Sequence, residues 1–261
     1  MIKTVYREQP GLRPLGDLDL LVRAEDLPGV EEVLRLHGFR PLVPSSSFFH
    51  NGAAAFDLHT DLIGAGRIRG RALAFHFDQE TLWQEALPLD PQDPTLLVLS
   101  PRHQLLHLVV HALKHSFTRL IWFIDLGLAL RQVQWGESID HAKAVGALRA
   151  LTYTLLALRA LMGVQIPSET LRELSRLNRL EHLFVQQVIS RNPRQALGEV
   201  MVALSIPGVI GKLSYLFEFG FPRQEILAEV SPSTPAWLLY PQRLCHIMAR
   251  GVREGSSLWR S

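Results

Sequence analysis

Apolar and polar positions follow two different patterns along the chain, and the first pattern is an alternating one. Alternation of apolar and polar residues predicts strands over residues 17–22, 39–43 and 54–62. A helix is expected between the first two strands, because apolar residues recur at helical spacing between Asp26 and Gly38. Asp26 can cap the start of this helix, and the glycine ends it.

The second pattern is helical throughout. Apolar residues recur every three to four positions and predict helices over residues 101–113, 118–132, 138–162, 167–174 and 180–191. Residues 196–221 are mostly apolar but are interrupted by Pro207 and by glycines, so we expect short helices packed on the core. The alternative for this stretch is a face that meets a partner or a membrane surface.

Three prolines separate the two patterns. Pro88, Pro91 and Pro94 interrupt the chain within a few residues, and we predict a domain boundary there. The chain is therefore expected to be α+β, with an α/β domain over residues 1–95 and a helical domain over residues 96–261.

The first predicted strand carries a pair of carboxylates. Asp17 and Asp19 follow Gly16 and are one residue apart, so both project from the same face of a strand, whereas Leu18 and Leu20 point toward a core. Two aspartates on one face repel each other unless a cation lies between them, and hard oxygen ligands suit Mg²⁺. The alternative is a turn followed by a solvated edge strand.

The third predicted strand repeats this polar face. Asp57, His59 and Asp61 alternate with apolar residues, so three side chains that can bind a metal share one face. An exposed face of an antiparallel sheet also alternates in this way and is the alternative. The loop that follows carries Arg67, Arg69 and Arg71, which could contact phosphate or could simply be solvated.

A column of histidines marks the first helix of the second pattern. Its members lie four residues apart, which places them along one broad stripe of the helix: His103, His107, His111 and His115. A pair at this spacing can bind zinc, but the glutamate that a zinc protease requires is missing. The remaining alternatives are partly buried structural histidines, or one or two histidines that meet a nucleotide or its acceptor together with Lys114. Asp125 lies in an apolar helix, and we expect His111, His115 or Lys114 to be its partner.

Composition restricts the protein to an ordinary globular class. The chain has 261 residues and a net charge of +2, and no dense run of Lys or Arg indicates nucleic-acid binding by charge alone. Cys245 is the only cysteine, so no internal disulfide is possible. The N-terminus has no apolar signal core and no stretch is long and apolar enough to span a membrane, so we expect a cytoplasmic protein.

Three blocks of sequence resemble a known family. Residues 16–22 read GDLDLLV, residues 56–59 read FDLH, and residues 111–126 contain HALKH followed by LIWFIDL. In this order they resemble the uncharacterised nucleotidyltransferase family of bacteria, which belongs to the DNA polymerase β-like superfamily. The resemblance covers roughly residues 10–130.

The resemblance implies a small mixed sheet with helices on one face, followed by a helical domain. It implies that Asp17 and Asp19 bind two Mg²⁺ ions and that Asp57 is the third, catalytic carboxylate. The expected reaction moves a nucleoside monophosphate from a nucleoside triphosphate to an unidentified acceptor, which is a small molecule, a protein or a nucleic acid. Residues expected to bind the nucleotide or the acceptor are Arg13, Gly16, His59, His111, Lys114 and His115.

The chain departs from the superfamily pattern at one point. The superfamily has a glycine-bearing turn before the paired aspartates, whose amides hold the triphosphate. Gly11 and Gly16 are the only glycines before Asp17, and no Gly-Ser or Lys-Gly pair occurs there. Either the true start lies upstream, or the turn was lost and the protein is a catalytically degenerate binding or regulatory partner. A metal-dependent hydrolase that uses the histidine column is a third alternative.

Overall fold

A computed structural model gives the fold, and it divides the chain into two compact units. It describes residues 6, 10–43, 46–174, 176–191, 195–230, 234–235 and 237–245. We call Leu15–Arg71 with Leu213–Ser261 the sheet unit, and Met1–Pro14 with Ala72–Lys212 the helical unit. The domain boundary near residue 95 stays a prediction, because compactness alone does not show which part folds independently.

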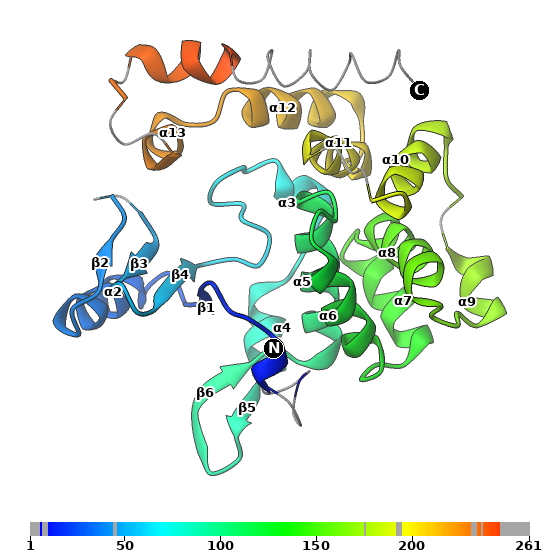
Figure 1. Cartoon of the computed structure of the whole chain (residues 1–261), viewed down its shortest axis with the longest axis horizontal. Coiled ribbons are helices and arrows are strands. Elements are labelled where there is room, and N and C mark those ends of the chain that lie inside the picture. The colour runs from blue at the N-terminus through cyan, green and yellow to red at the C-terminus, as the bar shows by residue number, and fades with distance from the viewer. Residues whose placement is uncertain are drawn as a thin grey trace. The chain divides into compact units, whose positions relative to one another are not determined.

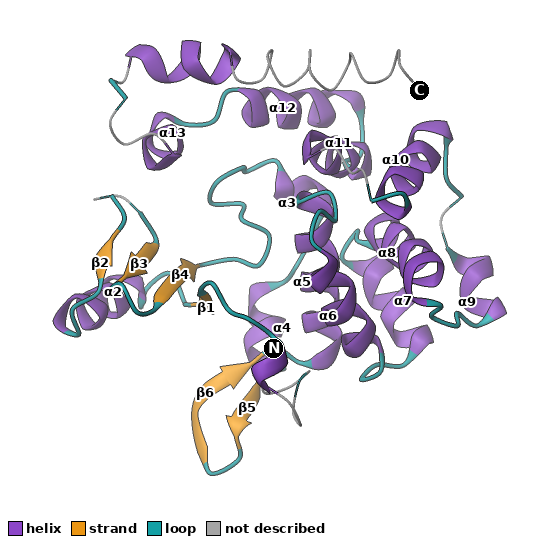
Figure 2. Ribbon diagram, viewed as in Figure 1, coloured by secondary structure: helices purple, strands orange, loops and turns teal. Residues whose placement is uncertain are grey.

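The sheet unit contains a small mixed sheet (Figure 2). Its strands are β1 (Leu18–Leu21), β2 (Arg40–Pro41), β3 (Phe48–His50) and β4 (Ala55–His59), in the order β1-β4-β3-β2. β1 pairs parallel with β4, whereas β3 pairs antiparallel with both β2 and β4. The α+β class and the mixed sheet are therefore as predicted.

One helix and one face of the sheet form the core of this unit. The helix α2 (Leu27–Leu36) contributes the buried Leu34, which packs with Phe49 of β3 and Leu58 of β4. Leu20 of β1 packs against the same cluster, but Leu18 is 43% exposed, so the core contacts of β1 begin at Leu20. Because side chains alternate along a strand, the residues between these apolar ones face away from α2.

A second, two-stranded sheet lies where the domain boundary was predicted. β5 (Leu87–Asp90) and β6 (Asp93–Val98) form an antiparallel hairpin around Pro91 and Gln92. Prolines normally argue against strands because they lack an N–H donor, but a two-stranded ribbon consists of edge strands only and tolerates them. The short helices α3 (Arg71–Ala74) and α4 (Gln79–Gln84) precede the hairpin.

The helical unit is built around α5 (Pro101–Lys114), which packs against four other helices (Figure 1). These are α6 (Leu120–Leu130), α7 (Trp135–Ala144), α8 (Leu148–Met162) and α11 (Gln195–Ser205). α9 (Ser168–Glu173) packs on α7, and α10 (Arg179–Ile189) packs on α8. The predicted helices at residues 101–113, 118–132, 167–174 and 180–191 are confirmed with small shifts of their ends.

The single helix predicted over residues 138–162 is wrong, because the structure has two helices there. Gly146 has a φ of +76° and separates α7 from α8. A Cβ atom at this position would lie 2.4 Å from the carbonyl oxygen of Ala74. The turn therefore requires a glycine for both its backbone conformation and its packing.

The apolar stretch at residues 196–221 folds as two helices. α11 buries Met201 and Val202, as expected for helices packed on the core. α12 (Val209–Gly220) instead exposes large apolar side chains, among them Ile210 and Phe217, and α13 (Gln224–Val230) follows it. Among the described residues, no helix has both the length and the apolar character needed to cross a membrane.

Candidate metal centre

The exposed face of the β1–β4 pair carries the candidate site. Asp19 and Asp57 are register partners in the parallel pair, so their carboxylates project side by side. His59 Nε2 lies 3.1 Å from Asp19 Oδ1 and 3.4 Å from Asp57 Oδ2. One potential ligand atom from each of the three residues lies within 4.8 Å of the others. The sequence alternation that predicted a shared polar face for Asp57 and His59 is therefore matched by the geometry.

Electrostatics bind His59 to the two carboxylates. Burial disfavours the charged form of the His59 ring, but hydrogen bonds to Asp19 and Asp57 outweigh it and raise the pKa to about 9. Burial likewise opposes the charge on Asp57, but the contact with His59 outweighs it and lowers the pKa of Asp57. At neutral pH an imidazolium therefore lies between the carboxylates and offsets their repulsion.

These residues fit a divalent cation. Two carboxylate oxygens and one imidazole nitrogen within 4.8 Å of one another can coordinate a single ion. The oxygens suit Mg²⁺ or Mn²⁺, and an imidazole ligand favours Mn²⁺ over Mg²⁺. Asp19 is more than half exposed, so water or substrate could reach an ion held there.

The residues just before β1 are not part of this three-residue group. Asp17 precedes the strand and is exposed, as is Gly16, where an added Cβ would meet no atom within 4 Å. Arg13 lies in the helical unit and forms an ion pair with Asp125, with 3.1 Å between its Nη2 atom and Oδ2. The structure thus groups Asp19, Asp57 and His59, and it does not bring Asp17 within the same distance.

The predicted partner of Asp125 is wrong. This fully buried carboxylate accepts hydrogen bonds from the hydroxyl of Tyr6 at 2.6 Å and from Arg13, and not from His111, His115 or Lys114. Tyr6 and Arg13 come from the N-terminal segment, more than 100 residues away in sequence. The carboxylate therefore fastens that segment to α6, and no local pattern in the sequence indicates such a contact.

The histidine column belongs to the helical unit and divides into two groups. His103 is buried, contacts Ser100 and stacks edge-on against His141 at 4.7 Å. His111 and His115 pack on Trp122 with ring centroids 5.3 and 5.5 Å away. No three histidine, cysteine or acidic side chains of this column form a metal-ligand group within the described part of the chain. Nucleotide or acceptor binding by His111, Lys114 and His115 stays a prediction.

Two residues act on Asp57 that the sequence did not assign to the site. Ser47 was not predicted at all, and Arg67 was predicted only as a phosphate contact or a solvated residue. Ser47 Oγ donates a hydrogen bond to Asp57 Oδ1 at 3.2 Å, but β3 beside it was not predicted, so nothing placed this serine near a carboxylate. Arg67 acts on Asp57 through its charge and helps to lower the pKa of that carboxyl. Its only signal in the sequence was an arginine-rich loop.

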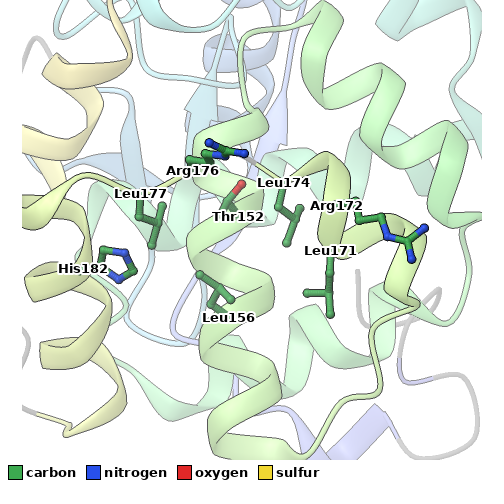
Figure 3. A pocket seen from close by; sticks show the side chains of 8 residues that line it. All are labelled: Thr152, Leu156, Leu171, Arg172, Leu174, Arg176, Leu177 and His182. Carbon is green, nitrogen blue, oxygen red and sulfur yellow. The ribbon is translucent and has the colours of Figure 1, made fainter.

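A pocket of about 550 Å³ lies elsewhere, within the helical unit (Figure 3). α8, α9, α10 and the segment between the last two surround it, with the following lining residues: Thr152, Leu156, Leu171, Arg172, Leu174, Arg176, Leu177 and His182. None of the site residues predicted from the sequence lines it. The chemistry instead selects the strand face with two carboxylates.

The fold and the site together define an α+β protein whose mixed sheet carries a carboxylate–histidine group that could hold a metal ion. The chain belongs to the uncharacterised nucleotidyltransferase family, whose family model matches residues 1–163. The resemblance noted in the sequence is thus confirmed, and the family supports nucleotidyl transfer as the general function. No curated protein and no solved structure matches the chain.

Proposed function

We propose that the protein is a Mg²⁺- or Mn²⁺-dependent nucleotidyltransferase that moves a nucleoside monophosphate from a nucleoside triphosphate to an acceptor. The observation that carries this proposal is the side-by-side arrangement of Asp19 and Asp57 on parallel strands in a member of a nucleotidyltransferase family. Carboxylates at this spacing supply the oxygen ligands that a metal–triphosphate complex needs.

The reaction forms one bond to phosphorus and breaks another. An acceptor oxygen bonds to the α-phosphorus, the bond from that phosphorus to the oxygen bridging to the β-phosphate breaks, and pyrophosphate leaves with the electron pair. The acceptor proton passes to water. A bound metal lowers the pKa of the acceptor hydroxyl and offsets charge on the phosphates.

The residues of the chain are proposed to bind the metal ion and to orient the nucleotide and the acceptor. Asp19 and Asp57 hold the ion, with Asp17 proposed as the carboxylate for a second ion. The lowered pKa of Asp57 makes it a weak base, so we assign it to metal binding and acceptor orientation rather than to proton removal. Ser47 fixes the Asp57 carboxylate through its hydrogen bond. Within the sheet unit, Gly16 and His59 are proposed to contact the nucleotide or the acceptor, and the same role for Arg13, His111, Lys114 and His115 of the helical unit is proposed separately.

A catalytically degenerate binding protein is the second candidate. The observation that favours it is the position of His59, which neutralises Asp19 and Asp57 without any metal. A histidine that permanently occupies the cation position would leave a folded protein without transfer activity.

Metal binding and label transfer test both candidates. Binding of Mn²⁺ is measured by electron paramagnetic resonance, and transfer is measured from each α-labelled nucleoside triphosphate to a cell extract. D19N and D57N should each weaken Mn²⁺ binding at least about tenfold and abolish transfer. D140N, at an exposed aspartate of α7, is the matched control.

The outcomes separate the candidates. Label transfer that persists in D19N and D57N would contradict the proposed site. Tight Mn²⁺ and nucleotide binding without any transfer would contradict the enzyme and support the binding protein. His59→Asn, which removes the imidazole, should strengthen Mn²⁺ binding if the ring competes with the metal and weaken it if the ring is a ligand.

A further inference from the structure

The loop after β4 is held rigid from several sides, and it begins directly beyond the metal centre. It comprises residues 61–71, which follow His59 at the end of the strand. The Asp61 carboxylate accepts hydrogen bonds from the amides of Ile63, Ala65 and Gly66 at 2.9, 2.9 and 3.1 Å. Asp61 therefore closes the loop, although the strand pattern had placed it on the metal-binding face.

The far end of the loop is held by a distant part of the chain. The Glu218 carboxylate of α12 accepts from the consecutive amides of Arg69 and Gly70, each at 3.0 Å. Arg223 donates to the carbonyl of Gly66. Gly70 packs so closely on Tyr215 that an added Cβ would lie 2.9 Å from its ring and 3.3 Å from its Cα atom. The loop is thus fixed by residues that lie outside the segment matched by the family model.

The backbone of this loop is already committed. The amides of residues 63 and 65–71 all donate hydrogen bonds within the sheet unit, to Asp61, to Glu218 or to the carbonyls of Gly64 and Ile68. The buried Arg71 also uses its guanidinium internally, on the carbonyls of Ile63 and Gly64. These amides are therefore not available to cradle phosphate, as the amides of glycine-rich phosphate-binding loops do.

The rigid loop presents two exposed arginine side chains, Arg67 and Arg69, and of these Arg67 is the one whose charge acts on Asp57. The loop that carries Arg67 leaves β4 within two residues of His59 and is closed by Asp61, and the positive charge of Arg67 also helps to lower the pKa of Asp57. A guanidinium is always charged and matches the geometry of phosphate oxygens. Holding it on a fixed loop reduces the conformational entropy lost when an anion binds.

We propose that Arg67 binds the polyphosphate of the nucleotide beside the metal centre, and that Glu218 is the positioning residue that holds the Arg67 loop. This inference rests on the proposed function and names a residue of the described chain as a phosphate contact. The ligand class is a metal-bound polyphosphate, and the base of the nucleotide plays no part in the contact.

Polyphosphate binding by the full-length protein tests the assignment of Arg67. Calorimetric titration with inorganic tripolyphosphate and with ATP, both in the presence of Mg²⁺, should show that R67Q binds each ligand about tenfold more weakly than wild type. R40Q, at an exposed arginine of β2, removes the same charge from the same unit and should bind like wild type. Mn²⁺ alone should bind R67Q at least as tightly as wild type, because a nearby positive charge is removed.

The positioning role of Glu218 is tested by a conservative variant and by a double mutant. E218A should weaken tripolyphosphate binding, and E218Q should restore part of the affinity because its amide oxygen still accepts one hydrogen bond. Adding E218A to R67Q should cause no further loss, since Glu218 acts through Arg67. An additive loss would contradict the positioning role.

Failure of the inference differs from failure of the proposed function. If wild type binds MgATP and R67Q binds it equally well, Arg67 is not the phosphate contact, but the proposed function stands. If wild type binds neither ATP nor tripolyphosphate, both the proposed function and the role of Arg67 are overturned.

Discussion

At the scale of single residues, burial decides which ionisable groups serve the fold. His103 belongs to the sequence column that suggested metal binding, yet only 2% of its surface is exposed. Burial lowers the pKa of His103 to about 4, and the positive charges of His141 and Arg102 act in the same direction. The folded protein therefore holds this ring neutral, while Glu85 beside it pairs with Arg102.

The His103 pKa predicts a pH dependence of stability. The unfolded chain binds a proton at His103 below about pH 6.5, whereas the folded chain resists it down to about pH 4. Above pH 6.5, His103 is neutral in both states and the protein keeps its full free energy of unfolding. As the pH falls from 6.5 toward 4, protonation of His103 in the unfolded chain lowers this free energy by up to about 3 kcal/mol. Urea unfolding at pH 7.5, 6.5, 5.5 and 4.5 measures this loss.

His103→Asn supplies the comparison. The asparagine amide can still bond to Ser100 but does not titrate, so the loss of stability between pH 6.5 and 4.5 should shrink. Part of the loss should remain, because burial also lowers the pKa of His141. An unchanged pH dependence in the variant would show that His103 does not cause it.

At the scale of elements, close packing of helices fixes where glycine is needed. α11 crosses α5 at Gly198, where an added Cβ would lie 2.0 Å from the carbonyl oxygen of Leu113. Gly127 in α6 is also helical, but an added Cβ there would meet no atom within 4 Å. The same substitution should therefore have opposite effects at the two positions.

Glycine-to-alanine variants test this difference. G198A should destabilise the protein by about 3 kcal/mol, because the clash involves backbone and cannot be relieved by a side chain. G127A should stabilise it by about 0.5–1 kcal/mol through the higher helix propensity of alanine. Thermal and urea unfolding of both variants measure the effects. Equal effects would mean that α11 does not pack on α5 as described.

The sequence predicted most elements but not all of them. Helices such as α5 and α6 were predictable because their apolar positions recur regularly over several turns. β3 and the β5–β6 hairpin were not, because they are short and contain or neighbour prolines that locally oppose a strand. The break between α7 and α8 depends on Gly146, whose packing against Ala74 no local pattern shows.

At the scale of the whole molecule, a bound ion should stabilise the fold. A ligand that binds only the folded state raises the free energy of unfolding, by about 2.7 kcal/mol at 100 times its dissociation constant. Mn²⁺ should therefore raise the thermal midpoint of unfolding of the protein. Differential scanning calorimetry measures this shift.

The control for this prediction is the double variant D19N/D57N. It should show no stabilisation by Mn²⁺, whereas D140N should behave like wild type. An equal shift in D19N/D57N would mean that the ion binds elsewhere on the protein.

The sequence by itself determined the class of the protein and the face on which the site lies. Strand side chains alternate with a period of two, so the polar positions within β1, and those within β4, could each be assigned to one face of their strand without a structure. The three family blocks, in order, determined the family that the chain belongs to.

Only the tertiary structure decided which residues meet. The register of β1 on β4 opposes Asp19 to Asp57, His59 joins them, and Ser47 and Arg67 act on Asp57. Glu218 reaches its loop across 148 residues of sequence. Such contacts depend on how whole surfaces pack together, and a local pattern of side chains does not predict them.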